Sequence, residues 1–254
     1  MSTDDQRPSA GARRRERIVA ALGVVGRVEV GELSVELGVA EETVRRDLRA
    51  LEGEGMLRRA HGGAISVDSV GEHPEPDGAA RAIAGAARGL VPAGASVFLE
   101  AGAVGEALAG MLDAGSGVRI VTASVAVALA AALVPEPAET HLLGGVVGAE
   151  GTASGHWARE LAGSVHVDVA VIEPVGVAGG ALFASDPDRA AVTGAVAATA
   201  GTVVLVLAAH QAEGLAASMS LDRIDHAVVV PGALDGAALE LLAERGTPVT
   251  EVAA

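Results

Sequence analysis

The chain has 254 residues, half of them hydrophobic, a formal net charge of −15 and no cysteine. This length allows two domains, and the lack of cysteine excludes disulfides, thiolate nucleophiles and cysteine-ligated metals. All 18 basic residues are arginine, so no Schiff base and no lysine–phosphate contact can form. The polar, charged N-terminus has no signal-peptide pattern, which predicts a cytoplasmic protein.

The N-terminal segment is predicted to contain three helices. The spacing of Ile18 and Leu22 indicates a first helix, and the short run 28–30 indicates a strand. Residues 31–37 predict a second helix, after which Gly38 stands where a left-handed turn is needed. The pattern is typical of a helix-turn-helix.

A third helix is predicted over residues 41–52. Its apolar residues recur at i, i+4 and i+7 and form one buried stripe of Val44, Leu48 and Leu51. Arg46 and Arg49 then point away from that stripe, with Thr43 and Arg45 on its flanks. The helix therefore presents arginines to solvent.

A short basic hairpin follows the third helix and carries Arg58, Arg59 and His61. The order of helix, strand, helix, turn, helix and hairpin predicts a winged helix-turn-helix. An arginine-rich helix beside a basic ribbon can reach a major groove and its flanking phosphates together. The alternatives are a solvated basic face and a protein-interaction module.

Three motifs in this region resemble those of the DeoR family of bacterial transcription regulators. They are RERI at 15–18, GVAEETVRRDL at 38–48 and LEGEGMLRRAHGGA at 51–64. The resemblance implies a sequence-specific repressor of carbohydrate or related metabolic genes that binds a double-stranded DNA operator as a homodimer or higher oligomer. Where the family usually has serine, this chain has Ala40, and the lost helix cap should cost about 1 kcal/mol.

The expected roles in DNA binding follow from position. Arg46 and Arg49 are aimed at base edges, while Thr43 and Arg45 fix the phosphate backbone. The three arginines of residues 13–15 are expected to add electrostatic contacts. The predicted DNA-binding residues are Thr43, Arg45, Arg46, Arg49, Arg58, Arg59 and His61.

Charge is divided unevenly along the chain. Residues 7–61 carry 11 arginines against 9 acidic residues, whereas residues 62–254 carry 7 against 22. Because an acidic body repels DNA, we expect DNA contacts only in the first segment. The predicted parts of the chain are a disordered tail (1–12), a winged helix-turn-helix domain (13–65), a linker (66–80) and a C-terminal domain (81–254).

The C-terminal domain alternates helix-like and strand-like segments, which predicts an α/β fold with a mostly parallel sheet. Expected strands are 95–99, 119–121, 141–143, 167–172, 203–207, 227–230 and 249–252, and expected helices are 81–90, 104–112, 125–133, 186–200 and 234–244. The uncharged run 190–209 is long enough to raise the question of a membrane span. Its change from helix-like to strand-like residues argues against one, so no membrane contact is expected.

This domain resembles the sensor domain of the DeoR family, which is similar in fold to ribose-5-phosphate isomerase and glucosamine-6-phosphate deaminase. The resemblance implies a small-molecule effector, usually a phosphorylated sugar, at the carboxyl ends of the strands. The candidate effector-binding residues are Glu100, Gly102, Gly105, Ser124, Gly176 and His210.

The candidate effector site departs from the family's pattern. The family tends to have Asp-Ser-Gly-Thr-Thr where this chain has residues 100–104, so the serine and threonine hydroxyls are replaced by apolar side chains. The aspartate and lysine expected around His210 are also missing. A buried phosphate needs charge-assisted donors, and Arg189 is only a remote candidate. We therefore expect an altered ligand, or a domain used only for oligomerisation.

An enzyme of the sugar-phosphate isomerase or coenzyme A transferase-like fold is the alternative. Glu173 stands at a strand end and can be imagined as a nucleophilic carboxylate, but a solvated or capping acid is the preferred interpretation. No catalytic residue, metal site or cofactor is expected. Trp157 is expected to pack a helix against the sheet, and Phe98 and Phe183 to lie in the core.

Overall fold

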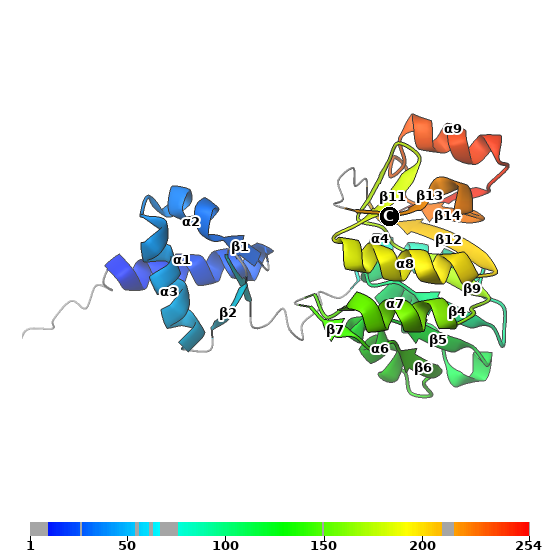
Figure 1. The fold of residues 1–254 in the computed structure, drawn as a ribbon, viewed down its shortest axis with the longest axis horizontal. Helices are drawn as coiled ribbons and strands as arrows, with labels where there is room; N and C mark the ends of the chain where they lie inside the picture. Colours follow the sequence, from blue (N-terminus) through cyan, green and yellow to red (C-terminus); the bar gives the residue numbers. More distant parts are fainter. Residues whose placement is uncertain are drawn as a thin grey trace, which may run out of the picture. The chain divides into compact units, whose positions relative to one another are not determined.

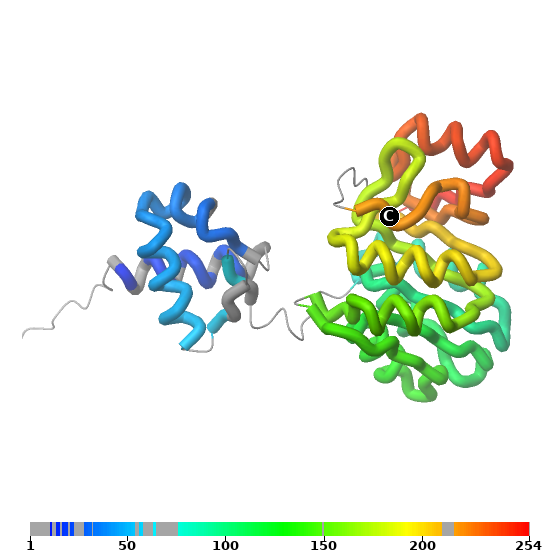
Figure 2. Tube along the Cα trace, viewed as in Figure 1, coloured from blue at the N-terminus to red at the C-terminus, as the bar shows by residue number. Residues whose placement is uncertain are grey.

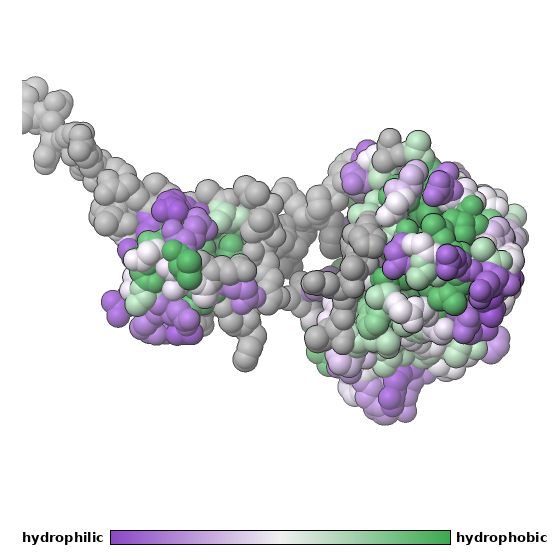
Figure 3. All heavy atoms as spheres, turned by 90° about the horizontal axis from the view of Figure 1, so that it is seen from above, coloured by the Kyte–Doolittle hydropathy of each residue, from purple (hydrophilic) through white to green (hydrophobic). Residues whose placement is uncertain are grey.

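The computed structural model describes residues 10–25, 27–53, 56–60, 63–66, 76–148, 150–209 and 216–253. The chain divides into two compact units, Met1–His73 and Pro74–Ala254 (Figure 1, Figure 2). On the face seen in Figure 3, hydrophobic side chains of the C-terminal unit lie open among hydrophilic ones.

The N-terminal unit is a winged helix-turn-helix, as the sequence predicts. Its three strands form an antiparallel sheet in the order β1-β3-β2, and the helices pack on it around a small apolar core. The elements are α1 (Ala10–Val25), β1 (Arg27–Glu29), α2 (Val30–Leu37), α3 (Glu41–Gly53), β2 (Leu57–Ala60) and β3 (Gly63–Ser66).

The turn between α2 and α3 has the predicted geometry. Gly38 ends α2 in the left-handed region, with φ at 65°. Val39 follows, donates its N–H to the Ser34 carbonyl at 3.1 Å and packs against the core. The predicted stripe on α3 is buried, and Ala40 supplies only its carbonyl, which accepts the Thr43 N–H at 2.9 Å.

An ion pair that the sequence did not predict fastens α1 to α3. Arg14 donates from Nε to Asp47 Oδ2, and from Nη2 to Asp47 Oδ1 at 3.1 Å. Asp47 is buried on the inner side of α3 because its carboxylate has this bidentate partner. Arg14 is therefore part of the unit's packing, and the electrostatic contact with DNA expected of residues 13–15 stays a prediction.

The C-terminal unit is built on a seven-stranded parallel sheet. Its strand order is β15-β14-β12-β9-β4-β5-β6, and every described pairing in it is parallel. The strands are β4 (Ser96–Leu99), β5 (Arg119–Thr122), β6 (Glu139–Leu142), β9 (Val169–Ile172), β12 (Thr202–Leu207), β14 (His226–Val229) and β15 (Val249–Glu251). The central strands are buried on both faces, which explains their continuous apolar runs.

Helices cover both faces of this sheet (Figure 1). On one face α4 (Gly78–Arg88), α5 (Ala103–Ala109) and α6 (Val125–Ala132) form one apolar core with the strands. On the other face α7 (Gly155–Ser164), α8 (Pro187–Thr199) and α9 (Gly236–Glu244) form a second. Helix α4 begins at Gly78, so it takes in the end of the predicted linker.

Several elements were not predicted from the sequence. Besides α7, they are two small antiparallel sheets, β7 (Val146–Val147) with β8 (Ala153–Ser154), and β10 (Gly176–Ala178), β11 (Ala181–Ala184) and β13 (Ala216–Ser220) in the order β10-β11-β13. The remaining elements are short 3-10 turns at 114–116 and 221–223.

The burial of the three aromatic residues agrees only in part with the prediction. Phe98 is buried in the core as expected, whereas Phe183 is only partly buried. Trp157 does not pack between helix and sheet: 72% of its surface is exposed, so that prediction was wrong. No helix in the described parts of the chain is long and apolar enough to cross a membrane.

Candidate functional sites

Two glutamates meet at the carboxyl ends of neighbouring central strands. Glu100 follows β4 directly, and Glu173 follows β9, which pairs with β4 in parallel. The Glu100 N–H donates to the Val171 carbonyl at 3.1 Å, which extends the pairing to the end of the strands. This edge of the sheet is where ligands bind in folds of this kind.

The Glu173 carboxylate lies at the first turn of α5. Its Oε2 atom accepts the Val104 N–H at 3.0 Å and the Gly105 N–H at 3.2 Å. A Cβ atom on Gly102 would lie 2.2 Å from the same oxygen, and one on Gly105 would lie 2.2 Å from the Glu100 carbonyl oxygen. Gly102 therefore leaves space for the Glu173 carboxylate, and Gly105 allows the backbone of α5 to approach that of Glu100.

Glu100 is buried and fully hydrogen-bonded. Its Oε2 accepts the Glu173 N–H at 2.9 Å, and its Oε1 accepts the Thr193 hydroxyl. The Nε atom of Arg189 lies 3.7 Å from Oε1. These contacts join the strand ends to α8, which carries both Thr193 and Arg189.

Arg189 enters the site from the first turn of α8. The carboxylate of Asp186 accepts the Arg189 N–H at 2.9 Å and caps this helix. The guanidinium donates from Nη2 to the Ala101 carbonyl at 2.6 Å, and Nη1 lies 3.7 Å from Glu150 Oε2. Its Nε is buried and has no hydrogen bond within the described residues. Arg189 is thus a central member of the site, although the sequence indicated only a remote one.

Burial shifts the pKa values of both Glu173 and Glu100, and the charge of Arg189 opposes both shifts. Burial raises the pKa of Glu173 to about 7, opposed by the Gly105 and Val104 N–H groups and by the Arg189 charge, while the Glu100 charge adds to the rise. Burial also raises the pKa of Glu100, opposed first by the charge of Arg189. Ionisation of these two carboxyl groups is therefore unfavourable even before any ligand binds.

The other predicted effector-binding residues do not lie in this cluster of side chains. Ser124 is buried, and its hydroxyl accepts the Val127 N–H at 3.3 Å as the cap of α6. Gly176 begins β10 and pairs with Phe183 in the small sheet. His210 lies outside the described residues. The structure brings together Glu100, Gly102 and Gly105, and adds Glu173, Arg189 and Thr193 to them.

Glu173 caps a helix, in line with the preferred interpretation of this acid. Its Oε2 atom accepts both backbone N–H groups, and the charged groups that act on its carboxyl are Glu100 and Arg189. A search of the described residues finds no group of three or more His, Cys, Asp or Glu side chains that could hold a metal.

Helix α3 offers a second candidate site, in the N-terminal unit. Arg45 pairs with Glu41 at 2.7 Å and Arg49 with Glu42 at 3.4 Å, so two of its arginines are held by acids of the same helix. Arg46 is exposed, and no ion pair is recorded for it among the described residues. Thr43 is half-buried on the flank. Arg58 and Arg59 lie on β2, in the predicted hairpin, but their side chains are outside the described part of the structure. His61 lies outside the described residues.

Comparison with known families matches both units. The sequence profile described as "DeoR-like helix-turn-helix domain" matches residues 14–70, and that described as "DeoR C terminal sensor domain" matches residues 78–229. The chain belongs to the DeoR family. The resemblance seen in the sequence motifs and the predicted two-part fold are both confirmed.

Curated DeoR-type relatives match over part of their length. A "Putative aga operon transcriptional repressor" of Escherichia coli O157:H7 is 36% identical over 40% of this chain and 41% of its own. The "HTH-type transcriptional regulator GlpR" of Haloferax volcanii is 47% identical over 24% of each chain. A "Lactose phosphotransferase system repressor" of Lactococcus lactis is 44% identical over 22% of each. The matches thus span less than half the length of these relatives.

Solved structures similar to the sensor unit include ribose 5-phosphate isomerases. That of Methanocaldococcus jannaschii is 16% identical, with a TM-score of 0.35, over 51% of each chain. The isomerase of Plasmodium falciparum is 13% identical, with a TM-score of 0.34, over 50% of this chain and 49% of its own. Likenesses at this level carry no argument about activity.

Replacing Glu173 by glutamine should change how stability depends on pH. The pKa of Glu173 rises from its ordinary value of 4.5 to about 7 in the folded chain. Between these two pH values the folded chain keeps a proton on Glu173 that the unfolded chain has lost. This group therefore lowers the free energy of unfolding as pH rises through that window. Glu173→Gln removes the effect while preserving an acceptor oxygen.

Relative to the wild type, the glutamine variant should gain up to about 3 kcal/mol between pH 4.5 and 8. Urea denaturation at a series of pH values, followed by circular dichroism, measures this gain. Parallel stability curves for the two proteins over that range would contradict the proposed burial of the Glu173 carboxyl.

Proposed function

We propose that this protein is a sequence-specific DNA-binding repressor of carbohydrate genes whose sensor site does not take a phosphate in the usual way. Membership of the DeoR family supports regulation, and relatives named as repressors of the aga operon and of lactose phosphotransferase systems support the class of genes. The observation that carries DNA binding is the exposed arginine face of α3 in a helix-turn-helix.

Helix α3 is proposed to enter the major groove, with Arg46 reading a guanine edge through two hydrogen bonds. Arg45 and Arg49 are held only by exposed ion pairs, and such pairs contribute at most about 1 kcal/mol. DNA phosphates can therefore replace Glu41 and Glu42 as their partners at small cost. The wing, with Arg58, Arg59 and His61, is proposed to contact the flanking phosphates.

The sensor site is proposed to reject dianionic effectors because the protein supplies its own anion there. The Glu173 carboxylate already uses the Val104 and Gly105 N–H groups, and Glu100 lies beside it. A phosphate at the same turn would have to displace Glu173 and approach a second acid. The one guanidinium present, that of Arg189, is already shared by acids.

An uncharged polyhydroxylated ligand, or a cationic one, fits this charge balance better than a sugar phosphate. A regulator that needs no ligand, with the sensor unit used for assembly, is compatible with the same site. An enzymatic role receives no support from the geometry, because the acid at the strand end serves as a helix cap. Action on an operator places the proposed function in the cytoplasm.

The role of α3 can be tested with a matched pair of arginine variants. Arg46→Ala should weaken binding to the preferred operator by about 10- to 100-fold and broaden the base preference at one position, because a bidentate contact is lost. Arg17→Ala removes another exposed arginine, whose partner is Glu36, and should leave sequence preference unchanged. The operator is obtained by selection from random DNA and affinity by shift assays over a range of salt.

Affinity should also fall steeply as salt rises, since counterions return to the DNA. If Arg46→Ala keeps both the affinity and the base preference of the wild type, α3 is not the reading helix.

The effector proposal predicts a negative result with common metabolites. At pH 8, where Glu173 is ionised, a panel of sugar phosphates at millimolar concentration should shift the melting temperature of the full chain by less than about 1 °C. Differential scanning fluorimetry with the unphosphorylated sugars as the matched panel measures this. A rise of several degrees with one sugar phosphate would show that the anion site is open.

A further inference from the structure

Helix α7 and the neighbouring strand β7 expose large apolar side chains. Trp157 and Leu161 lie four residues apart on one stripe of α7, with exposed fractions of 72% and 44%, and Val146 of β7 is 72% exposed. We call Val146, Trp157 and Leu161 the Trp157 face. Monomeric proteins seldom leave such side chains clustered in water unless the surface has a partner.

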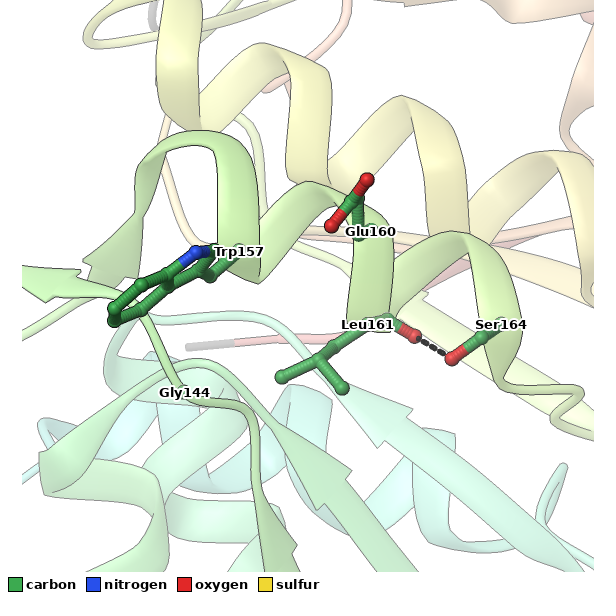
Figure 4. A pocket seen from close by; sticks show the side chains of 5 residues that line it. All are labelled: Gly144, Trp157, Glu160, Leu161 and Ser164. Carbon is green, nitrogen blue, oxygen red and sulfur yellow. Dashed lines mark hydrogen bonds between the residues drawn. The ribbon is translucent and has the colours of Figure 1, made fainter.

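The shape of the Trp157 face is a ridge between two hollows. One hollow of about 460 Å³ is lined by Gly144, Trp157, Glu160, Leu161 and Ser164, and the other, of about 200 Å³, by Gly145, Val146, Ser154, His156 and Trp157. In Figure 4 the indole of Trp157 and the side chain of Leu161 both point from α7 toward the Gly144 segment. The larger hollow is wide enough to receive an indole side chain.

The residues of the Trp157 face are uncharged, whereas the unit as a whole is strongly acidic. Residues 74–254 carry 20 acidic residues against 7 arginines, a net charge of −13. The acid that borders the larger hollow, Glu160, lies 3.3 Å from His156, whereas Arg159 projects from the opposite side of α7. Two copies of so acidic a unit repel each other over most orientations, and α7 offers an approach with little repulsion.

The arrangement is also self-complementary. Trp157 and Leu161 lie one turn apart on the same stripe of α7, so a two-fold axis that passes midway between them sets each Trp157 against Leu161 of the other copy. The ridge of one copy then meets the larger hollow of the other. A two-fold contact uses one patch twice, which matches a face that carries both ridge and hollow.

We propose that the Trp157 face is the surface on which a second copy of this chain docks. The inference deepens the proposed function, since a repressor that reads two half-sites needs such a dimer, but the contact itself requires no DNA. A stable dimer buries roughly 800 Å² on each partner, with an apolar centre and a polar rim. The Trp157 face supplies the centre, and a tryptophan there is the kind of residue that dominates binding.

The chain's one tryptophan makes the contact directly observable. In the wild-type full chain, sedimentation equilibrium should show a dimer, and Trp157 emission should move to shorter wavelength as concentration rises through the dissociation constant. Leu161→Glu keeps the reporter and should raise that constant at least 100-fold. Leu239→Glu changes a leucine of α9 with a similar exposed fraction, 37%, and should leave assembly unchanged.

Circular dichroism tests whether each variant is folded. If Leu161→Glu is not folded, Val146→Asp on β7 takes its place. The proposal is overturned if the wild type stays monomeric with solvent-exposed tryptophan emission, or if Leu161→Glu assembles as the wild type does. Shift assays keep the two proposals distinct. If Leu161→Glu loses the dimer, the interface is supported even when the wild type binds no DNA. If Leu161→Glu assembles as the wild type does while the wild type binds DNA, the interface is rejected and the proposed DNA binding stands.

Discussion

The chemistry of the sensor unit depends on one interaction, the contact of the Glu173 carboxylate with the first N–H groups of α5. A helix N-terminus is the natural place for an anion in a parallel α/β fold, and here the protein fills it from the neighbouring strand. Gly102 leaves the space for that carboxylate, because any Cβ there would collide with it. The backbone of the turn and the acid are therefore matched to each other.

Charge balance then decides what the site can accept. Arg189 lies beside Glu100 and its charge also acts on Glu173, while burial raises the pKa of both acids. Adding a phosphate would place a third negative group beside them, at a cost that the one guanidinium does not offset. The fold of the family's sensor domain is thus kept, while side chains of this chain disfavour a phosphorylated ligand.

The sequence predicted the winged helix and the parallel sheet well, because both depend on local periodicity and on buried apolar runs. It indicated that phosphate donors were missing, but it did not show what replaced them. The Glu173 contact joins residues 69 positions apart, and only the pairing of β4 with β9 brings them together. Trp157 was misplaced for the opposite reason: an apolar stripe shows amphipathicity, and does not show whether the stripe faces the core or a partner.

The most direct test of this account is the behaviour of the Val104 and Gly105 amides in a pH titration followed by nuclear magnetic resonance. Both amide signals should shift together with a midpoint near pH 7, as the Glu173 carboxylate that they contact ionises. At pH 8, millimolar inorganic phosphate should leave them in place. Signals that do not titrate near pH 7, or that move saturably with phosphate, would contradict the claim that Glu173 occupies this turn.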